Sequence, residues 1–327
     1  MRLKPPRFWS RPRSGPAAWL LRPLAALMTW GVRHRRQQEG YAAPVPVLCC
    51  GNVTTGGTGK TPLALDLVQR LRERGHQPHI LSRGHGGRER GPLQVRPGHH
   101  TARDVGDEPL LLARAAPTWV GRNRGETARL ASAAGADCLI MDDGFQNPSL
   151  QKTLSILVMD GGVGLGNGHV IPAGPLREPL ADALRRAQAI VVIGEDRFRL
   201  LSTLSTLLPK GQARLLPGPE IRSLQGKRVV AFAGIGRPEK FFDMLKEAGV
   251  NPIRCLPFPD HHVYSATDIQ RLEVLSREAG TILVTTAKDA VKLPSAFAAT
   301  VRVISVELLW DDPAFPEHLL DLLFHRP

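Results

Sequence analysis

Apolar and polar positions alternate along the chain in a way that predicts strands followed by helices. Short apolar runs typical of buried strands are separated by segments in which apolar residues recur at helical spacing. The expected strands cover residues 45–50, 79–82, 137–141, 153–159 and 189–193, and the expected helices cover 62–74, 108–114 and 126–134, with a long loop at 84–103. This alternation favours an α/β fold, with a parallel sheet covered by helices on both faces.

The alternation resumes in the last third of the chain. Residues 202–226 mix Ser, Pro, Gly and Leu, and we expect a linker there. Beyond it, we expect strands at 228–233, 252–258 and 281–286 and helices at 238–248 and 266–279. The pattern therefore predicts an N-terminal arm (residues 1–40), a core domain (41–220) and a smaller α/β domain (221–327).

The arm contains an amphipathic segment, residues 17–32, with the sequence AAWLLRPLAALMTWGV. At about 100° per residue, its large apolar side chains cover one wide face: Trp19, Leu20, Leu21, Leu24, Leu27, Met28, Trp30 and Val32. Arg22, Thr29 and Arg33 share the opposite face, and Pro23 is expected to kink the helix or start it afresh. The segment is too short and too interrupted for a confident membrane span.

Charge changes the interpretation of this arm. The net charge is +13, and residues 1–38 carry nine Lys or Arg and no acid, whereas the other 289 residues carry 34 basic and 30 acidic side chains. A cationic arm suits anionic lipid or nucleic acid. The tryptophan-edged apolar face favours a helix lying in an anionic membrane interface, and we expect neither nucleic acid nor an obligate protein partner. The alternative is a helix packed on the protein's own core.

Composition is that of an ordinary folded protein, with 42% hydrophobic and 22% charged residues. The four cysteines, Cys49, Cys50, Cys138 and Cys255, lack metal-ligand spacing, and Cys49 and Cys50 lie in an apolar run. We therefore expect no disulfide framework and a reducing compartment.

The strongest chemical signal is the run GNVTTGGTGKT, residues 51–61, which joins an expected strand to an expected helix. Glycines let the backbone amides curl around phosphate oxygens, and the helix start adds partial positive charge. We expect ATP phosphates to bind at Thr54, Thr55, Gly56, Gly57, Thr58, Gly59, Lys60 and Thr61. Lys60 would reach the β- and γ-phosphates, and the Thr61 hydroxyl would ligate Mg²⁺.

The loop departs from the standard pattern, because Thr54 stands where that pattern has Gly. Its core resembles the variant loop of partitioning-type ATPases, which carry a signature Lys where this chain has Thr55.

Acidic residues follow or precede expected elements in positions suited to phosphoryl transfer. Asp142 and Asp143 end an apolar strand, where a P-loop enzyme needs a carboxylate for Mg²⁺. Asp107 precedes an expected helix, so it either caps that helix or accepts a proton from an acceptor hydroxyl.

Together these motifs resemble the tetraacyldisaccharide 4′-kinases in order and approximate spacing over residues 45–293. Beyond the loop, the resemblance rests on LSRGHGG (81–87), VGDEP (105–109), DDGFQ (142–146), GNG (166–168), PAGPLREP (172–179), AFAGIG (231–236), FPDH (258–261) and TTAKDAVK (285–292). The basic N-terminal helix also has a counterpart, the family's inner-membrane attachment.

The resemblance implies transfer of the ATP γ-phosphoryl group to the 4′-hydroxyl of a lipid A disaccharide precursor, giving lipid IVA at the cytoplasmic face of the inner membrane. By resemblance, Asp107 is the general base, His261 pairs with it, and Arg177 neutralises charge on the transferring group. Asp142, Asp143, Gln146 and Glu178 would manage Mg²⁺ and its waters.

Two positions depart from the family pattern: His85 replaces a usual Tyr, and Ala287 replaces a common Glu. The rival interpretations are a membrane-associated partitioning-type ATPase, against which Thr55 counts, and a non-enzymatic adaptor.

Overall fold

A computed structural model describes residues 6–11, 15–278 and 280–324 of the protein. Its centre is a nine-stranded sheet, parallel except where β8 pairs with β13 and β3 with β4. In spatial order the strands are β13 (Val306–Trp310), β8 (Lys210–Pro217), β7 (Ala189–Ile193), β6 (Leu154–Asp160), β1 (Val47–Gly51), β5 (Cys138–Asp142), β2 (Pro78–Ser82), β4 (Thr118–Val120) and β3 (Leu93–Gln94). The predicted parallel α/β sheet is confirmed.

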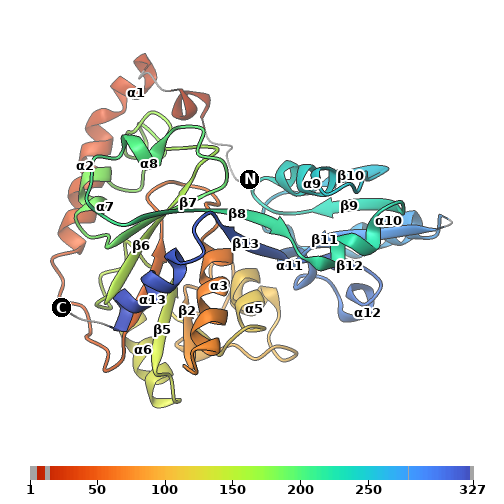
Figure 1. Ribbon diagram of the computed structural model, residues 1–327, viewed down its shortest axis with the longest axis horizontal. Helices are drawn as coiled ribbons and strands as arrows, with labels where there is room; N and C mark the ends of the chain where they lie inside the picture. The colour runs from red at the N-terminus through yellow and green to blue at the C-terminus, as the bar shows by residue number, and fades with distance from the viewer. Residues whose placement is uncertain (1–5, 12–14, 279, 325–327) are drawn as a thin grey trace.

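Helices cover both faces of this sheet, so its central strands are buried on both sides (Figure 1). Side chains of β1 alternate between the faces: Val47 and Cys49 join one core cluster, and Leu48 and Cys50 the other. The first face packs against α6 (Arg124–Ala133) and α7 (Leu180–Leu184), and the second against α3 (Lys60–Glu73), α5 (Asp107–Leu112) and α13 (Phe315–Phe324). All four cysteines are free.

Helix α3, which follows the glycine-rich loop, is fixed by an apolar stripe. Leu63, Leu67 and Leu71 recur every four residues and are fully buried against the sheet. Each contributes about 2 kcal/mol by leaving water. The first turn of α3 is therefore held rigidly at the sheet edge.

A second sheet, of four parallel strands, lies within the residues that were expected to form the smaller domain. Its order is β10 (Arg254–Pro257), β9 (Arg228–Ala233), β11 (Thr281–Thr286) and β12 (Arg302–Ile304). The helices of this part are α9 (Pro238–Glu247), α10 (Ala266–Ser276), α11 (Ala287–Ala290) and α12 (Ser295–Ala298). Two separate core clusters lie on its two faces.

The predicted linker at 202–226 is wrong. It contains β8, which pairs with β7 and β13 inside the large sheet, followed by the 3₁₀ helix Pro219–Leu224. The boundary at 221 is also wrong for the chain's last segment, because β13 and α13 return to the large sheet. The β8–β13 pair leads from the large sheet toward the small one (Figure 1). Only Gly211 and Ala213 of β8 are buried, so its sequence lacks the apolar run that marked the inner strands.

Smaller differences occur in the predicted loop at 84–103, which holds β3 and the start of α4 (Ala102–Val105), and β4 was not predicted. The short edge strands carry too few apolar residues for periodicity to reveal them.

The N-terminal segment forms α1 (Pro16–Leu20) and α2 (Arg22–Arg35), with Pro23 in the first turn of α2, as a restarted helix requires. Ala18 and Ala25 are buried against the body, whereas the large apolar face is exposed, with Trp19 at 69% and Trp30 at 68%. Packing on the body therefore uses the face of small residues, and the apolar face remains open. Of the nine cations, Arg2, Lys4 and Arg13 lie outside the described residues. Within the described part of the chain, no helix is long and apolar enough to cross a membrane.

Candidate active site

The candidate site lies where the central strands end. In the parallel register Cys50 pairs with Asp142, and Gly51 pairs with Leu157 of β6. The loop after β1, the carboxylates after β5 and Asp160 at the end of β6 therefore meet at one edge. In open α/β sheets, ligands bind at this carboxyl edge, where strand order changes direction.

The glycine-rich loop is shaped by two left-handed residues, Gly56 (φ 111°) and Gly59 (φ 88°). A Cβ at Gly59 would lie 3.0 Å from the Ile193 side chain, so this position needs glycine for space as well. The segment before Arg177 braces the loop, since Thr55 N donates to Pro175 O at 2.9 Å. No side chain caps α3, and the Thr58 hydroxyl is buried without a partner among the described residues. These unused donors suit an anion.

Thr61 and Asp142 make a pair suited to a divalent cation. The Thr61 hydroxyl donates to Asp142 Oδ2 at 3.1 Å, whereas Asp142 Oδ1 is buried with no partner among the described residues. Burial, reinforced by the Glu108 carboxylate, raises the pKa of Asp142 to about 7. A buried carboxylate oxygen without a donor fits Mg²⁺, which takes hard oxygen ligands and keeps positions for phosphate and water.

Asp143 has different partners from its neighbour. It adopts a left-handed backbone (φ 57°), lies 2.9 Å from Arg177 Nη1 and lies 3.7 Å from Lys60 Nζ. Burial opposes ionisation of Asp143, but Lys60 and Arg177 outweigh it and the pKa is lowered. The two cations predicted to meet phosphate thus gather around one carboxylate.

Gln146 and Glu178 lie behind this centre. Gln146 Nε2 donates to Asn52 O at 2.8 Å and to Glu178 Oε1 at 2.9 Å. Glu178 is fully buried, and both of its oxygens accept from Arg186 at 3.0 Å, with Arg36 as a further partner. This bonding makes Glu178 a support for Gln146, in contrast to the expected metal role. In the described ranges, no group of three or more His, Cys, Asp or Glu has metal-binding geometry.

Asp107 and His261 meet across the two domains. His261 Nδ1 lies 2.9 Å from each carboxylate oxygen of Asp107. Asp107 is the first residue of α5 and Gly106 is the N-cap, and the Asp107 carboxylate also accepts from Glu108 N in the first turn at 3.0 Å. Burial would raise the pKa of Asp107, but the His261 hydrogen bond and the charge of Lys288 outweigh it and lower the pKa. His261 itself has a left-handed backbone (φ 57°), a strained state that often accompanies function.

The second domain supplies cations that sequence reasoning missed. Arg237 donates to Gly57 O of the loop at 3.0 Å and also to Asp160, which Lys240 reaches at 3.0 Å. Lys288 lies 3.0 Å from Glu108 and 4.0 Å from Asp107. Asp160 carried a detectable signal, because it ends an apolar strand as Asp142 does. Lys288 belongs to the TTAKDAVK motif, but nothing in the sequence showed that it meets Asp107, and Arg237 carried no signal. His85 lies beside His261, with ring centroids 5.8 Å apart.

Comparisons with known proteins agree on one family. The sequence model described as Tetraacyldisaccharide-1-P 4′-kinase matches residues 17–324. Similar curated proteins include the tetraacyldisaccharide 4′-kinase of Gluconobacter oxydans, 69% identical over 99% of both chains, and that of Gluconacetobacter diazotrophicus, 55% identical over 97% of both. Among solved structures, LpxK from Aquifex aeolicus in complex with ATP is 26% identical with a TM-score of 0.76, covering 94% of this chain and 99% of that one.

Proposed function

Because the chain belongs to the tetraacyldisaccharide-1-P 4′-kinase family, we propose that it transfers the γ-phosphoryl group of ATP to the 4′-hydroxyl of a tetraacyldisaccharide 1-phosphate, which forms lipid IVA in lipid A biosynthesis. The observation that carries this proposal is the contact between Asp107 and His261. A sugar hydroxyl is a poor acid, so a phosphoryl acceptor of this kind needs a positioned proton acceptor. An ATPase that only switches conformation needs no such acceptor from a second domain.

The loop and its neighbours would hold the nucleotide. The loop amides and the uncapped start of α3 face the triphosphate, and Lys60 and Arg177 exchange Asp143 for phosphate oxygens. Thr61 and Asp142 would hold Mg²⁺, with Asp143 and Gln146 ordering its waters. The ion supplies charge neutralisation at the phosphates when bound.

The dyad would act on the acceptor. Asp107 takes the proton of the 4′-hydroxyl as the oxygen attacks phosphorus, and His261 Nδ1 fixes the carboxylate in place. Lys288 helps to keep Asp107 ionised before the acceptor arrives. Since transfer depends mainly on positioning and charge, closing one domain on the other completes the site.

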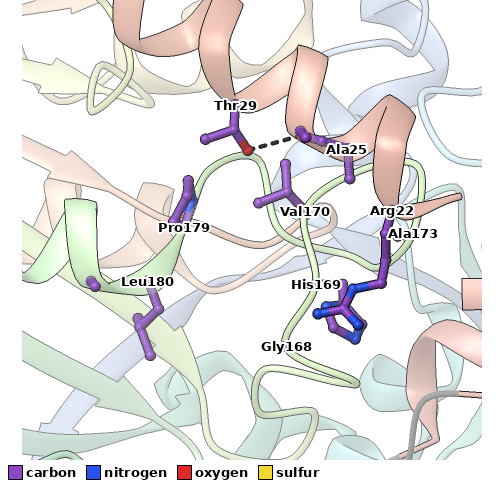
Figure 2. A pocket seen from close by; sticks show the side chains of 11 residues that line it. Arg22, Ala25, Thr29, Gly168, His169, Val170, Ala173, Pro179 and Leu180 are labelled. Carbon is purple, nitrogen blue, oxygen red and sulfur yellow. Dashed lines mark hydrogen bonds between the residues drawn. The ribbon is translucent and has the colours of Figure 1, made fainter. Parts of the chain in front are cut away.

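The N-terminal helices would hold the lipid. Their exposed apolar face suits a membrane interface, with the body on the cytoplasmic side of the inner membrane as a peripheral protein. A cavity of about 370 Å³ lies between α2 and residues 168–181. Figure 2 shows Ala25, Val170 and Leu180 around it, with Arg22 and His169 toward one end. Apolar side chains around the cavity suit an acyl chain, and the two basic side chains at one end suit the charged head group to which that chain is attached.

The direct test is transfer of ³²P from labelled ATP to purified tetraacyldisaccharide 1-phosphate. We expect labelled lipid from the wild-type protein and almost none from Asp107→Ala, with ATP binding retained in both. ATP hydrolysis without a labelled lipid would favour the partitioning-type ATPase instead.

A further inference from the structure

A second cavity, of about 240 Å³, lies at the C-terminal end of α2, away from the phosphate loop. Five charged residues line it: Arg33, Arg36, Asp182, Arg185 and Arg186. Two come from α2 or the residue after it, one from α7 and two from the residues after α7. Such a concentration of arginine is more than is needed to attach one helix.

The ion pairs around the cavity leave positive charge in excess. Arg33 donates to Asp182 at 2.7 Å, and Arg185 contacts the same carboxylate. Arg36 and Arg186 share Glu178. Four guanidinium groups thus face two carboxylates, an excess of two positive charges.

Donors remain available in this cavity. Arg36 Nε is buried and has no hydrogen-bond partner among the described residues. The side chains of Arg33 and Arg185 are 58% and 69% exposed, so each can turn further N–H groups toward a ligand while holding Asp182. A guanidinium fork matches the oxygens of phosphate, and several forks around one cavity define a specific anion site.

We propose that this cavity binds a phosphate group carried by a lipid. The inference rests on the proposed function, because the cavity is connected to the candidate site and to the lipid-facing helix. Glu178 joins Arg36 and Arg186 to Gln146, and Gln146 joins them to Asn52 before the phosphate loop. On the other side, the helix that carries Arg33 exposes Leu27 and Trp30. The phosphate is either the 1-phosphate of the disaccharide substrate or the head group of an anionic phospholipid.

The test compares Arg33→Ala and Arg185→Ala with Arg35→Ala, which removes an equal charge from α2 but lies outside the cavity. Each variant is assayed in neutral detergent with the tetraacyldisaccharide 1-phosphate and with the same disaccharide lacking that phosphate. Each is also sedimented with phosphatidylcholine vesicles with and without phosphatidylglycerol. Wild-type and Arg35→Ala turnover show separately that the proposed function holds.

If the substrate phosphate binds, Arg33→Ala and Arg185→Ala raise KM about fivefold or more for the 1-phosphate substrate only. If a phospholipid head group binds, these two variants lose vesicle binding that depends on phosphatidylglycerol, beyond the loss in Arg35→Ala, and KM in detergent is unchanged. If Arg33→Ala and Arg185→Ala behave as Arg35→Ala does in both assays, the proposal is overturned. This holds even if the wild-type protein transfers phosphate fully, as the proposed function requires.

Asp182→Asn separates phosphate binding from a purely structural ion pair. If the arginines only hold α2 against α7, removing their carboxylate damages the protein as Arg33→Ala does. If they bind phosphate, Asp182→Asn frees two guanidinium groups, so KM falls or vesicle affinity rises. Arg33→Ala has the opposite effect on the same quantity. Equal losses in the two variants would contradict the proposal.

Discussion

His261 Nδ1 lies 2.9 Å from both carboxylate oxygens of Asp107, although the two residues are 154 positions apart and belong to different domains. The carboxylate is almost wholly buried, and the second domain reaches it with the His261 imidazole and, at 4.0 Å, with Lys288 Nζ. If this pair acts as one unit, Asp107→Ala and His261→Ala each lower kcat by about 10²-fold or more with little change in ATP affinity. The double variant then costs less than the product of the two single losses. Steady-state kinetics of the four proteins measure this, and strictly multiplicative losses would show independent action.

The phosphate loop gives a second prediction. Lys60→Ala removes a cation that lies 3.7 Å from Asp143 and next to the uncapped start of α3. We expect transfer to fall about 10²-fold or more, with an unchanged circular dichroism spectrum, because the lost charge acts on phosphates. The control is Lys246→Ala, which removes an exposed lysine of α9 that pairs with Asp243 of the same helix. Near-normal transfer by Lys60→Ala would remove the basis for the nucleotide assignment.

Asp142 should make stability depend on pH and on Mg²⁺. Its folded pKa of about 7 lies above that of an unfolded carboxyl, so the metal-free folded protein holds a proton that the unfolded chain releases between about pH 4 and 7. Stability therefore falls as pH rises through this window. Since Mg²⁺ must replace that proton, the rise in Tm caused by Mg²⁺ with ATP should be larger at about pH 8 than at about pH 6.

Two substitutions test whether Asp142 is the residue that holds this proton. Asp142→Asn should stabilise the metal-free protein at about pH 8 by on the order of 1–3 kcal/mol and abolish transfer. Asp143→Asn should destabilise it, because Asp143 is paired with Lys60 and Arg177 and its pKa is lowered. Thermal melts with and without Mg²⁺ measure the change in stability for each variant. If the two substitutions shift Tm equally and in the same direction, Asp142 and Asp143 do not have the separate roles assigned here.

The exposed face of α1 and α2 gives a fourth prediction. Replacing Leu27 and Trp30 with serine leaves the buried Ala25 face intact and removes two large side chains from the outer face. We expect weaker sedimentation with anionic vesicles and a higher KM for the lipid, without a change in KM for ATP. A matched change at Val274, exposed on α10 of the second domain, should have no effect. Unchanged vesicle binding in the first variant would mean that this face does not meet lipid.

Arg237 tests how the second domain contacts the nucleotide site. It donates to the Gly57 carbonyl and, with Lys240, holds Asp160 at the end of β6. Arg237→Ala should raise KM for ATP several-fold, by about 1 kcal/mol in binding, because the loop loses a contact that favours the closed arrangement. Isothermal titration with ATP and Mg²⁺ measures the affinity directly, with Arg254→Ala, which removes an exposed arginine of β10, as the control. If Arg237→Ala binds ATP as tightly as Arg254→Ala does, Arg237 does not contribute to nucleotide binding.

Elements whose signals are local could be predicted from the residues alone. A buried strand, a glycine turn and a helix start are neighbours in the chain, so the loop at residues 51–61 and the carboxylate that ends β5 were both predictable. Pro23 likewise marked the start of α2, because its restriction acts on the residues beside it.

Contacts between groups that lie far apart in the chain could not be predicted in this way. β8 joins the large sheet by pairing with β7, and β13 joins it by pairing with β8 at the edge, where few of their side chains are buried and periodicity is weak. Arg237 donates a hydrogen bond to Gly57, and Glu178 forms ion pairs with Arg36 and Arg186. No local sequence pattern encodes these contacts. Local backbone preferences act within a few residues, whereas these contacts join segments that are far apart in the chain and meet only when the whole fold is packed.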